Sequence, residues 1–597
     1  MSTTASAPEL RRRTPLSSRF AGLLPGRADY RDLPRTWRGD LLAGVTVGIV
    51  ALPLALGFGV SSGLTAEQGL VTAIIAGLLA AVFGGSHVQV SGPTGAMVVV
   101  LVPIVASHGA AAVSAVALMA GVLVLLAGAL RVGRAVAYIP WPVIEGFTLG
   151  IACIIGMQQI PLLTSAHHAA PGEHSSNAIV AAGQSLLAAD PTYLLWALAA
   201  VAIVVACMVG LPRLHPQIPG SLVGIAVVTL LAAVVPTPLA TIGTIPSSLP
   251  VPSLPLLAPD ALISLVPAAI TVAALAAIES LLSARVAAGM SDTGAYEPDR
   301  ELVGQGIASM GAALFGGMPA TGAIARTSVN VRSGGRTRLA SVVHALVLLA
   351  FVYIAAGPIG RVPLAALAGV LLVTAVRMIH VATVRTIMNS TRTDAWTFVL
   401  TALVTVSVDL IVAVLIGVAL AAVFALRTVS RMSGIDLAPV QSDDPRAGDE
   451  QIVTARFIGP LLFVSAERVF DTVMSVGPRT SVVILRMSTL ELVDASGANV
   501  LAEIVRGLER RGITVLIKGV REHHDALFRE VGVMSALRHE KHVFTDADAA
   551  LAHARSHVER EREKAERLAD DSGGHGSPIV STKQAARLRA LVSRRRG

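Results

Sequence analysis

The feature that most limits the possible folds is a long succession of apolar segments, which continues to about Arg427. Several of these segments approach 20 residues, the length that a helix needs to cross the hydrocarbon core of a bilayer. In the whole chain of 597 residues, 53% are hydrophobic and only 14% are charged, against about 25% charged residues in ordinary soluble domains. The sequence therefore predicts a polytopic α-helical membrane protein.

The apolar segments divide into two sets of seven expected spans. The first set covers residues 41–60, 66–84, 93–107, 113–130, 141–160, 192–210 and 218–235. The second set covers residues 262–288, 300–316, 320–333, 338–356, 362–378, 394–408 and 409–427. We expect residues 1–40 to precede this membrane domain, which would extend over 41–431.

Arginine placement predicts the orientation of these spans. Positive residues beside a first span mark the cytoplasmic side, and residues 1–40 contain eight arginines. The loops at 161–191 and 236–260, which would lie outside, contain no Lys or Arg, and Arg361 is the exception to the pattern. We therefore expect an inner (plasma) membrane protein with both termini in the cytoplasm. The further arginines on the cytoplasmic side would be Arg131, Arg134, Arg213, Arg300, Arg332, Arg336, Arg377, Arg385, Arg392 and Arg431.

Two corresponding segments interrupt the apolar pattern. FGG at 83–85 is followed by PTGA at 93–96, and the later segment reads FGGMPATGAIARTSVN over 315–330. Each segment ends one apolar run and begins another that is too short to cross a bilayer alone. Such a pair of interrupted segments in two halves points to the binding site of a transporter. Chance repetition of small residues in a chain rich in Ala and Gly is the alternative.

The interrupted segments predict an anion site. Broken helices survive in a bilayer only where they are buried or line a cavity. We expect half-helices to begin after extended stretches at 87–92 and 318–320, each with unpaired N–H groups and partial positive charge at its N-terminus. Two such ends that face each other can hold an anion. The residues expected to contact it, through hydroxyls or closely approaching backbone, are Thr94, Gly95, Ala96, Thr321, Gly322 and Ala323.

Glu279 is the second candidate functional residue. It lies inside a long apolar helix, where an ionisable side chain is costly and by default functional. Ser283 is four residues further on and shares its face. We interpret Glu279 as a proton carrier or a ligand of a coupling cation; pairing with Arg326 or capping of a neighbouring helix is the structural alternative. Arg326 could add positive potential to the anion site, or its side chain could extend to the cytoplasmic surface.

The composition changes near Met432. Residues 432–450 are polar and predict a linker, and short β-rich runs then alternate with helical ones over 451–555, which indicates a small α/β domain. The expected strands are IVTARFI, LLFV, SVVILRM and TVLIKGV, and the expected helices lie near 466–476, 496–510, 521–532 and 546–558. Residues 556–597 form a charged tail, expected to be disordered, whose basic end contacts anionic membrane lipid or remains solvated.

Several classes of function are excluded. The net charge of +8 comes without a basic stripe and base-stacking aromatic residues on a soluble fold, so no nucleic-acid partner is expected. We find no nucleophile–base set, phosphate loop or metal-ligand cluster, so we expect no enzymatic activity, no cofactor and no metal site. His167, His168 and His174 lie in an outer loop without Cys or carboxylate partners, which is typical of a solvated loop.

These segments resemble the sulfate permease (SulP) family. The similar stretches are GDLLAGVTVGIVALPLALGFGVSSGL, PTGAM, AIESLLSARVA, ELVGQG and GGMPATGAIARTSVNVRSGGRTRLASVVHAL, and LELVDASGANVL resembles the STAS domain that is commonly attached to that family. The resemblance covers about residues 35–555 and is specific for the family but not for the substrate. The pattern is closest to that of bacterial bicarbonate and sulfate carriers.

The resemblance implies a fold and a mechanism. The fold would be a 7+7 inverted repeat with a core and a gate domain, often dimeric and moving like an elevator. The anion would lie between the third and tenth spans, near Glu279 in the eighth. Sodium-coupled members place an aspartate and a threonine at the positions of Glu279 and Ile324, which favours protons over sodium here. In phosphorylated relatives of the STAS fold the modified serine precedes a glycine, as Ser496 precedes Gly497; a helix N-cap is the alternative role of Ser496.

The leading hypothesis is therefore a secondary active transporter of a small inorganic oxyanion, sulfate or bicarbonate, by symport with H+ or Na+. A homodimer and an unidentified cytoplasmic partner of the STAS domain are expected. A C4-dicarboxylate transporter of the same family is the nearest alternative, since paired helix ends suit any carboxylate. A regulated anion channel, or an anion sensor with the STAS domain as its output, is the alternative from another class.

Overall fold

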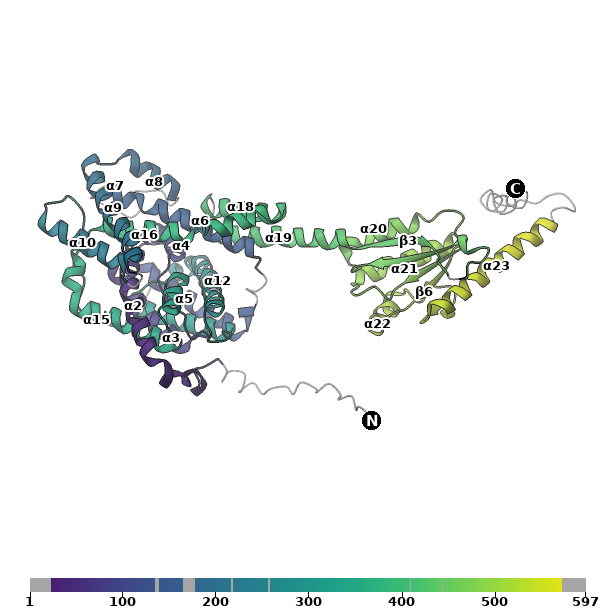
Figure 1. Cartoon of the computed structure of the whole chain (residues 1–597), viewed down its shortest axis with the longest axis horizontal. Coiled ribbons are helices and arrows are strands. Elements are labelled where there is room, and N and C mark those ends of the chain that lie inside the picture. The colour runs from purple at the N-terminus through teal and green to yellow at the C-terminus, as the bar shows by residue number, and fades with distance from the viewer. Residues whose placement is uncertain are drawn as a thin grey trace. The chain divides into compact units, whose positions relative to one another are not determined.

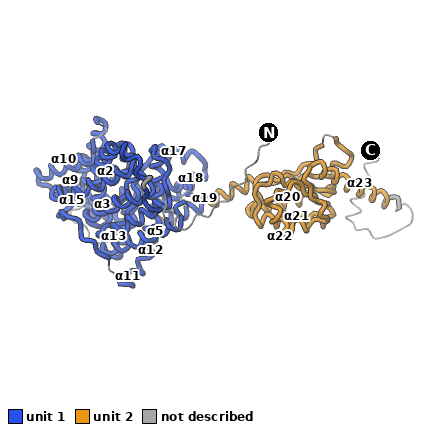
Figure 2. The backbone as a smooth tube through the Cα atoms, turned by 90° about the horizontal axis from the view of Figure 1, so that it is seen from below, with its two compact units in different colours: residues 1–421 blue, residues 422–597 orange. Residues whose placement is uncertain are grey.

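The computed structural model describes residues 23–134, 139–164, 178–215, 218–255, 258–407, 410–442 and 444–571. The chain divides into two compact units, residues 1–421 and 422–597 (Figures 1 and 2). Unit 1 is built of helices and one short two-stranded sheet, and unit 2 contains a five-stranded sheet with its helices.

Unit 1 has the predicted inverted-repeat architecture of two sets of seven spans. Among the described residues, nine helices are long and apolar enough to cross a membrane, and the remaining spans are shorter or more polar. The first set is α2 (Leu33–Ser61), α3 (Ala66–Phe83), α4 (Gly95–His108), α5 (Ala111–Ala129), α6 (Trp141–Gln158), α9 (Pro191–Leu214) and α10 (Gly220–Val234). The second set is α12 (Val266–Met290), α13 (Pro298–Leu314), α14 (Ile324–Arg332), α15 (Arg338–Gly360), α16 (Leu364–Met378), α18 (Arg392–Ser407) and α19 (Leu410–Met432), which continues into unit 2. Shorter helices are η1 (Arg27–Tyr30), α7 (Ile160–Thr164), α8 (Ala178–Leu187), α11 (Pro259–Ser264) and α17 (Val381–Asn389).

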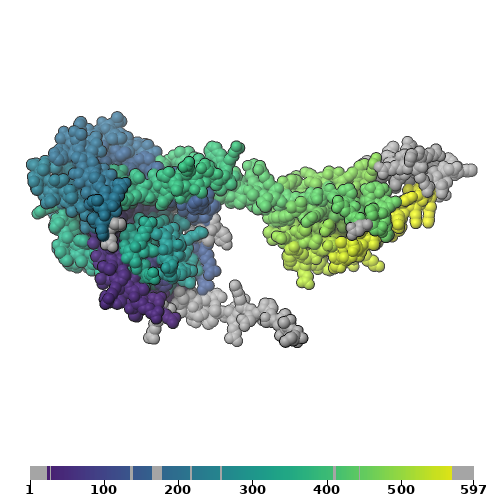
Figure 3. Space-filling model, viewed as in Figure 1, coloured from purple at the N-terminus to yellow at the C-terminus, as the bar shows by residue number. Residues whose placement is uncertain are grey.

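The helices of unit 1 pack as a core and a gate. In the core, α2, α3, α5, α12, α13 and α15 contact one another, whereas in the gate α6 packs on α18 and α9 packs on α10 and α16. In the space-filling view the blue atoms of α8 to α10 gather on one side of unit 1 (Figure 3). Small residues allow close packing in the core, as is typical of membrane helices: a Cβ on Gly306 of α13 would lie 2.6 Å from the carbonyl oxygen of Gly121 of α5.

An ion pair anchors η1 to the core. Arg300 of α13 donates to both carboxylate oxygens of Asp29, at 2.9 and 2.8 Å. Arg338 Nη2 lies 3.6 Å from Asp29 Oδ1. Burial raises the pKa of Asp29, but the hydrogen bonds and positive charges of the arginines outweigh it and lower this pKa to about 2. Since the folded-state pKa is below the ordinary value of 3.8, Asp29 stabilises the fold above pH 3.8 and ceases to do so as the pH falls towards 2.

Asp29→Asn is therefore expected to destabilise unit 1 by about 3 kcal/mol, because it leaves the buried Arg300 without its charged partner. The melting temperature of the detergent-solubilised protein, followed by size-exclusion chromatography after heating, should fall. The variant should also lose part of the decline in stability that the parent shows between pH 4 and pH 2. Asp32→Asn, which alters an exposed carboxylate at the start of α2, is the matched control. Equal melting of the Asp29 variant and the parent would contradict the assignment.

Unit 2 is an α/β domain with strand order β3-β4-β5-β6-β7. β3 (Gly434–Pro439) is antiparallel to β4 (Ile452–Ile458), and β5 (Val482–Arg486), β6 (Thr514–Lys518) and β7 (Val543–Phe544) continue the sheet in parallel. Alternate side chains of a strand face opposite sides of a sheet. One side packs on α20 (Phe463–Met474), α21 (Ala495–Arg510) and α22 (Glu522–Val531), and the other on α23 (Ala547–Asp571).

Three expectations for unit 2 differ from the structure. LLFV was expected to form a strand, but Phe463 begins α20 and Leu461 forms only an isolated bridge with Val493. A short apolar run cannot distinguish a strand from the first turn of a buried helix. The expected linker at 432–450 contains β3, which is ordered by its pairing with β4. The expected tail from residue 556 continues α23 to Asp571, and the basic end of the chain lies outside the described residues.

Candidate functional site

Two short strands bring the interrupted segments together. β1 (Ser91–Gly92) and β2 (Thr321–Gly322) pair antiparallel, with Gly92 opposite Thr321. The extended stretches predicted at 87–92 and 318–320 lead into these strands, and the half-helices α4 and α14 begin directly after them. The two N-cap residues are Thr94 for α4 and Ala323 for α14. The pairing therefore places the N-terminal ends of both half-helices at one location.

The first turn of each half-helix carries main-chain donors that the helix itself does not use. The first intrahelical bonds run from the Val98 N–H to Thr94 at 3.3 Å and from the Thr327 N–H to Ala323 at 2.9 Å. The N–H groups of Gly95 and Ala96 precede this bond in α4 and cannot have intrahelical partners. The helix dipoles add partial positive charge at the same two ends. The site therefore has the electrostatics that favour a bound anion.

Glu279 of α12 joins the two half-helices. The Thr94 hydroxyl donates to Glu279 Oε2 at 2.8 Å. The Thr321 hydroxyl lies 2.8 Å from the same oxygen and 2.9 Å from Thr94 Oγ1, and donates to one of them at a time, since it has one hydrogen. The structure thus brings together three predicted site residues from the third, eighth and tenth spans. The hydroxyls were expected to face the anion, but here they hold the carboxylate.

The backbone of Gly322 and Ala323 differs in part from the expectation. The Gly322 N–H donates to Ser280 Oγ at 3.1 Å, and the Ala323 N–H donates to the Val90 carbonyl at 2.9 Å. These two donors are therefore engaged within the protein, and the donors of α14 available to a ligand begin further along its first turn. Ser280 was not singled out in the sequence because a serine in an apolar helix is not by itself a functional signal.

Unpartnered polar atoms are buried beside Gly322. Ser283 Oγ and both amide atoms of Gln89 have no hydrogen-bond partner among the described residues, although buried polar groups normally have one. A Cβ on Gly322 would overlap Gln89 Nε2 and lie 3.2 Å from Ser283 Cβ. Ser283 was predicted for this site, whereas Gln89 was missed. The sequence feature that could have indicated Gln89 is its position, since it is an amide side chain in the extended stretch that precedes α4.

Arg326 is buried beneath the site. Its side chain is 1% exposed, and Nη2 donates to the Pro93 carbonyl at 2.6 Å. Gly92 has a φ of +150°, and a Cβ there would lie 2.7 Å from Arg326 Nη1, so this close approach requires glycine. The alternative in which Arg326 extends to the cytoplasmic surface is therefore wrong. Among the ion pairs of the described residues there is none between Arg326 and Glu279.

Polar residues of α13 fix the extended stretch before α4. The buried Glu301 accepts from the N–H groups of Gly85 and Ser86 at 2.8 and 3.0 Å, and Gln305 donates to Ser91 Oγ. These two residues belong to the ELVGQG segment, whose role the sequence did not reveal. The remainder of the stretch is held by Thr327, Asn330 and Ser341.

Two further predicted groups are placed differently or lie elsewhere. The N-cap of α21 is Asp494, whose carboxylate accepts from the Gly497 N–H at 2.7 Å, so the N-cap role considered for Ser496 is wrong. Ser496 is exposed in the first turn of this helix. His167, His168 and His174 lie outside the described residues.

The fold and the site define a polytopic membrane protein with two half-helices whose N-terminal ends meet, and with an appended α/β domain. Residues 37–401 match the Sulfate permease family, and residues 446–550 match the STAS domain. The chain belongs to the sulfate permease family. This is a family of anion transporters and not of enzymes.

Relatives of the chain include sulfate and bicarbonate carriers by name. The chain is 34% identical over 515 residues to the putative sulfate transporter YvdB of Bacillus subtilis, covering 85% of this chain and 96% of the relative. It is 35% identical over 422 residues to the bicarbonate transporter BicA of Picosynechococcus sp., covering 68% of this chain and 73% of BicA.

Solved structures of similar proteins have the same fold as this chain. The transmembrane domain of a cyanobacterial BicA superimposes with a TM-score of 0.59 and 33% identity, covering 64% of this chain and 98% of that domain. The structure of SLC26A9 covers 92% of this chain and 95% of its own, with a TM-score of 0.76 at 17% identity. This second likeness shows the fold alone.

Proposed function

We propose that the chain is a secondary active transporter of sulfate or bicarbonate, coupled to a cation and with H+ favoured over Na+. The observation that carries the proposal is the hydrogen-bonded group of Glu279, Thr94 and Thr321, which places one ionisable carboxyl at the N-terminal ends of both half-helices. The names of relatives such as YvdB and BicA support the two anions.

The geometry couples anion and proton through charge. An ionised Glu279 would repel an anion held at the adjacent helix ends, and this repulsion is strong where water is excluded. Protonation removes this charge and adds one O–H donor to the carboxyl group, which keeps part of its capacity to accept. Because a neutral carboxyl is a weaker acceptor than a carboxylate, it holds the two threonine hydroxyls less strongly, and they can turn to donate to the anion. Proton binding and anion binding therefore favour each other, which is the requirement for symport.

Sodium is the less favoured coupling ion. A sodium site needs several oxygen ligands. Sodium-coupled members of the family are expected to carry a threonine at the position where this chain has Ile324. Its side chain is apolar and offers no oxygen. Glu279, the two threonine hydroxyls and the unpartnered oxygens beside Gly322 would be the remaining side-chain candidates.

An elevator-like motion is supported by the location of the site. The residues of the site belong to α4, α12 and α14 and to the strands β1 and β2, which precede the two half-helices, and none belongs to the gate pairs α6–α18 and α9–α10. The core could therefore carry the anion as one body along the gate. An elevator predicts that a disulfide between core helix α2 and gate helix α16 stops transport without abolishing anion binding.

Transport by the purified protein in liposomes tests the proposal. An inward proton gradient is expected to drive concentrative uptake of radiolabelled sulfate or bicarbonate, and removal of sodium should leave this uptake unchanged. Flux that only runs downhill would indicate a channel, and binding without flux would indicate a sensor. Succinate in the same panel tests the C4-dicarboxylate alternative, because selective succinate uptake would replace the oxyanion in the proposal.

We place the protein in the cell's inner membrane with cytoplasmic termini, as a homodimer whose STAS domain binds a cytoplasmic protein, with Ser496 as a candidate phosphorylation site. Labelling of single introduced cysteines by a membrane-impermeant reagent tests the orientation. Crosslinking in the native membrane tests the dimer, and phosphopeptide mass spectrometry tests Ser496.

A further inference from the structure

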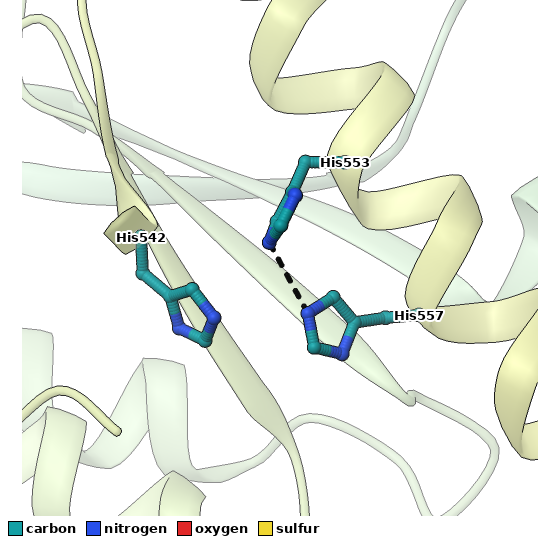
Figure 4. A group of neighbouring side chains, drawn as sticks. All are labelled: His542, His553 and His557. Carbon is teal, nitrogen blue, oxygen red and sulfur yellow. Dashed lines mark hydrogen bonds between the residues drawn. The ribbon is translucent and has the colours of Figure 1, made fainter. Parts of the chain in front are cut away.

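Three histidines from two elements of unit 2 converge at the edge of its sheet. His542 ends the short helix η4 (Glu540–His542) directly before the edge strand β7, and His553 and His557 lie one turn apart on α23. The three rings face a common space between the strand end and the helix (Figure 4). His542 is buried and the other two are partly exposed. This group is separate from the transport site, so a function for it does not depend on the transport proposal.

The spacing of the ring nitrogens suits a metal ion. His553 Nε2 and His557 Nε2 are 3.3 Å apart, and one nitrogen of each of the three rings lies within 4.8 Å of the others. In a tetrahedral zinc site with Zn–N bonds of about 2.0–2.1 Å, neighbouring ligand nitrogens are separated by about 3.3 Å. The pair on α23 already has this separation, and the His542 ring would have to move towards the pair to complete a three-nitrogen face.

Positive charge beside the cluster would oppose a bound cation. Arg538 and Arg560 act electrostatically on His557, and a metal ion binds only the neutral form of an imidazole ring. We therefore expect weaker binding than in a structural site with thiolate ligands.

A hydrogen bond between His553 and His557 is the simpler explanation of their contact. It would use one ring as donor and the other as acceptor, and it explains only two of the three rings. It does not account for His542, whose ring centroid lies 5.4 Å from the centroids of both. Convergence of all three rings is the feature that favours a ligand.

We propose that His542, His553 and His557 bind one divalent transition-metal ion, with zinc as the best match and water in the fourth position. Imidazole nitrogens suit zinc, and two histidines at positions i and i+4 of a helix present their rings on one face. The ion would connect α23 to the sheet edge, where β7 pairs with β6 through only Ile517 and Lys518. The proposal departs from the sequence-based expectation of no metal site.

Zinc binding to the full-length protein, purified without a polyhistidine tag and stripped with a chelator, tests this site. Titration against a chromophoric chelator should show one zinc ion per chain. The double variant His553→Gln/His557→Gln should bind at least about tenfold more weakly, since loss of a residue that merely hydrogen-bonds to a metal ligand already costs about 10–100-fold in affinity. His523→Gln, which alters an exposed histidine on α22 of the same unit, is the matched control and should bind as the parent does.

A second measurement separates ligand loss from misfolding. Without zinc, the double variant and the parent should have the same circular dichroism spectrum, and zinc should raise the melting temperature of the parent alone. X-ray absorption of the zinc-loaded parent should show histidine nitrogens at about 2.0–2.1 Å. No zinc binding by the parent, equal binding by the double variant, or a zinc shell without histidine would each overturn the proposal.

Discussion

Glu279→Gln is expected to abolish concentrative uptake driven by a proton gradient while anion binding persists. Glutamine has nearly the same shape and can still accept from Thr94 and Thr321, whose hydroxyls lie 2.8 Å from Glu279 Oε2. It remains neutral at every pH, so it imitates the protonated state without exchanging a proton. Uptake into liposomes should fall to the background of protein-free vesicles, and anion affinity should no longer vary with pH.

Binding and transport must be measured separately for this variant. Anion binding in detergent should persist, and downhill exchange of labelled for unlabelled anion should remain measurable. Glu145→Gln on α6 is the matched control: its carboxylate accepts from Trp141 of the same helix at 3.2 Å. Proton-driven uptake that is unchanged in Glu279→Gln would remove this residue from the coupling mechanism.

Gly322→Val is expected to weaken anion binding by about 10- to 100-fold. Overpacking costs about 1–3 kcal/mol, and relief of it would displace the residues that the bound anion requires in place. A Cβ at this position would overlap Gln89 Nε2, and the larger side chain would fill the space beside Ser283 Oγ. The affinity can be measured by equilibrium binding of labelled sulfate or bicarbonate to the purified protein.

Folding must be controlled in this experiment. Gly289→Val is the matched variant, since Gly289 lies on the same helix as Glu279 and a Cβ there meets nothing within 4 Å. Both variants should elute as the parent does in size-exclusion chromatography. A correctly folded Gly322→Val with normal affinity would move the anion site elsewhere.

Much of the architecture could be predicted from the sequence because its causes are local. The length of an apolar run determines whether it can cross a bilayer, and the number and order of the runs predicted the two sets of seven spans. The matched interruptions predicted where half-helices begin, since small residues and proline end one helix before the next starts. Glu279 could be singled out as a candidate for a similar reason. A carboxylate inside an apolar helix is costly to place in a bilayer, and the sequence shows this without knowledge of its partners.

The partners of these residues were decided by the tertiary structure. Ser91 and Gly322 are neighbours only because β1 pairs with β2. The N–H group of Ala323 is engaged by Val90 beside β1, and that of Gly322 by Ser280 of α12. The burial of Arg326 follows from its contact with Pro93, far away in the sequence. A sequence shows that a group needs a partner but not which distant atom supplies it. For that reason the paired chain segments, and not the apolar pattern, determine which donors are left for a ligand.

In unit 2, too, local patterns could be predicted from the sequence, whereas contacts between distant elements could not. Alternating β-rich and helical runs predicted its class, because each run is a local pattern. The strand β3 and the histidine cluster were not predicted, since β3 is ordered by pairing with β4, and His542 meets His553 and His557 only when α23 packs on the sheet. The local sequence thus determined which elements form, whereas contacts between distant elements determined which side chains meet.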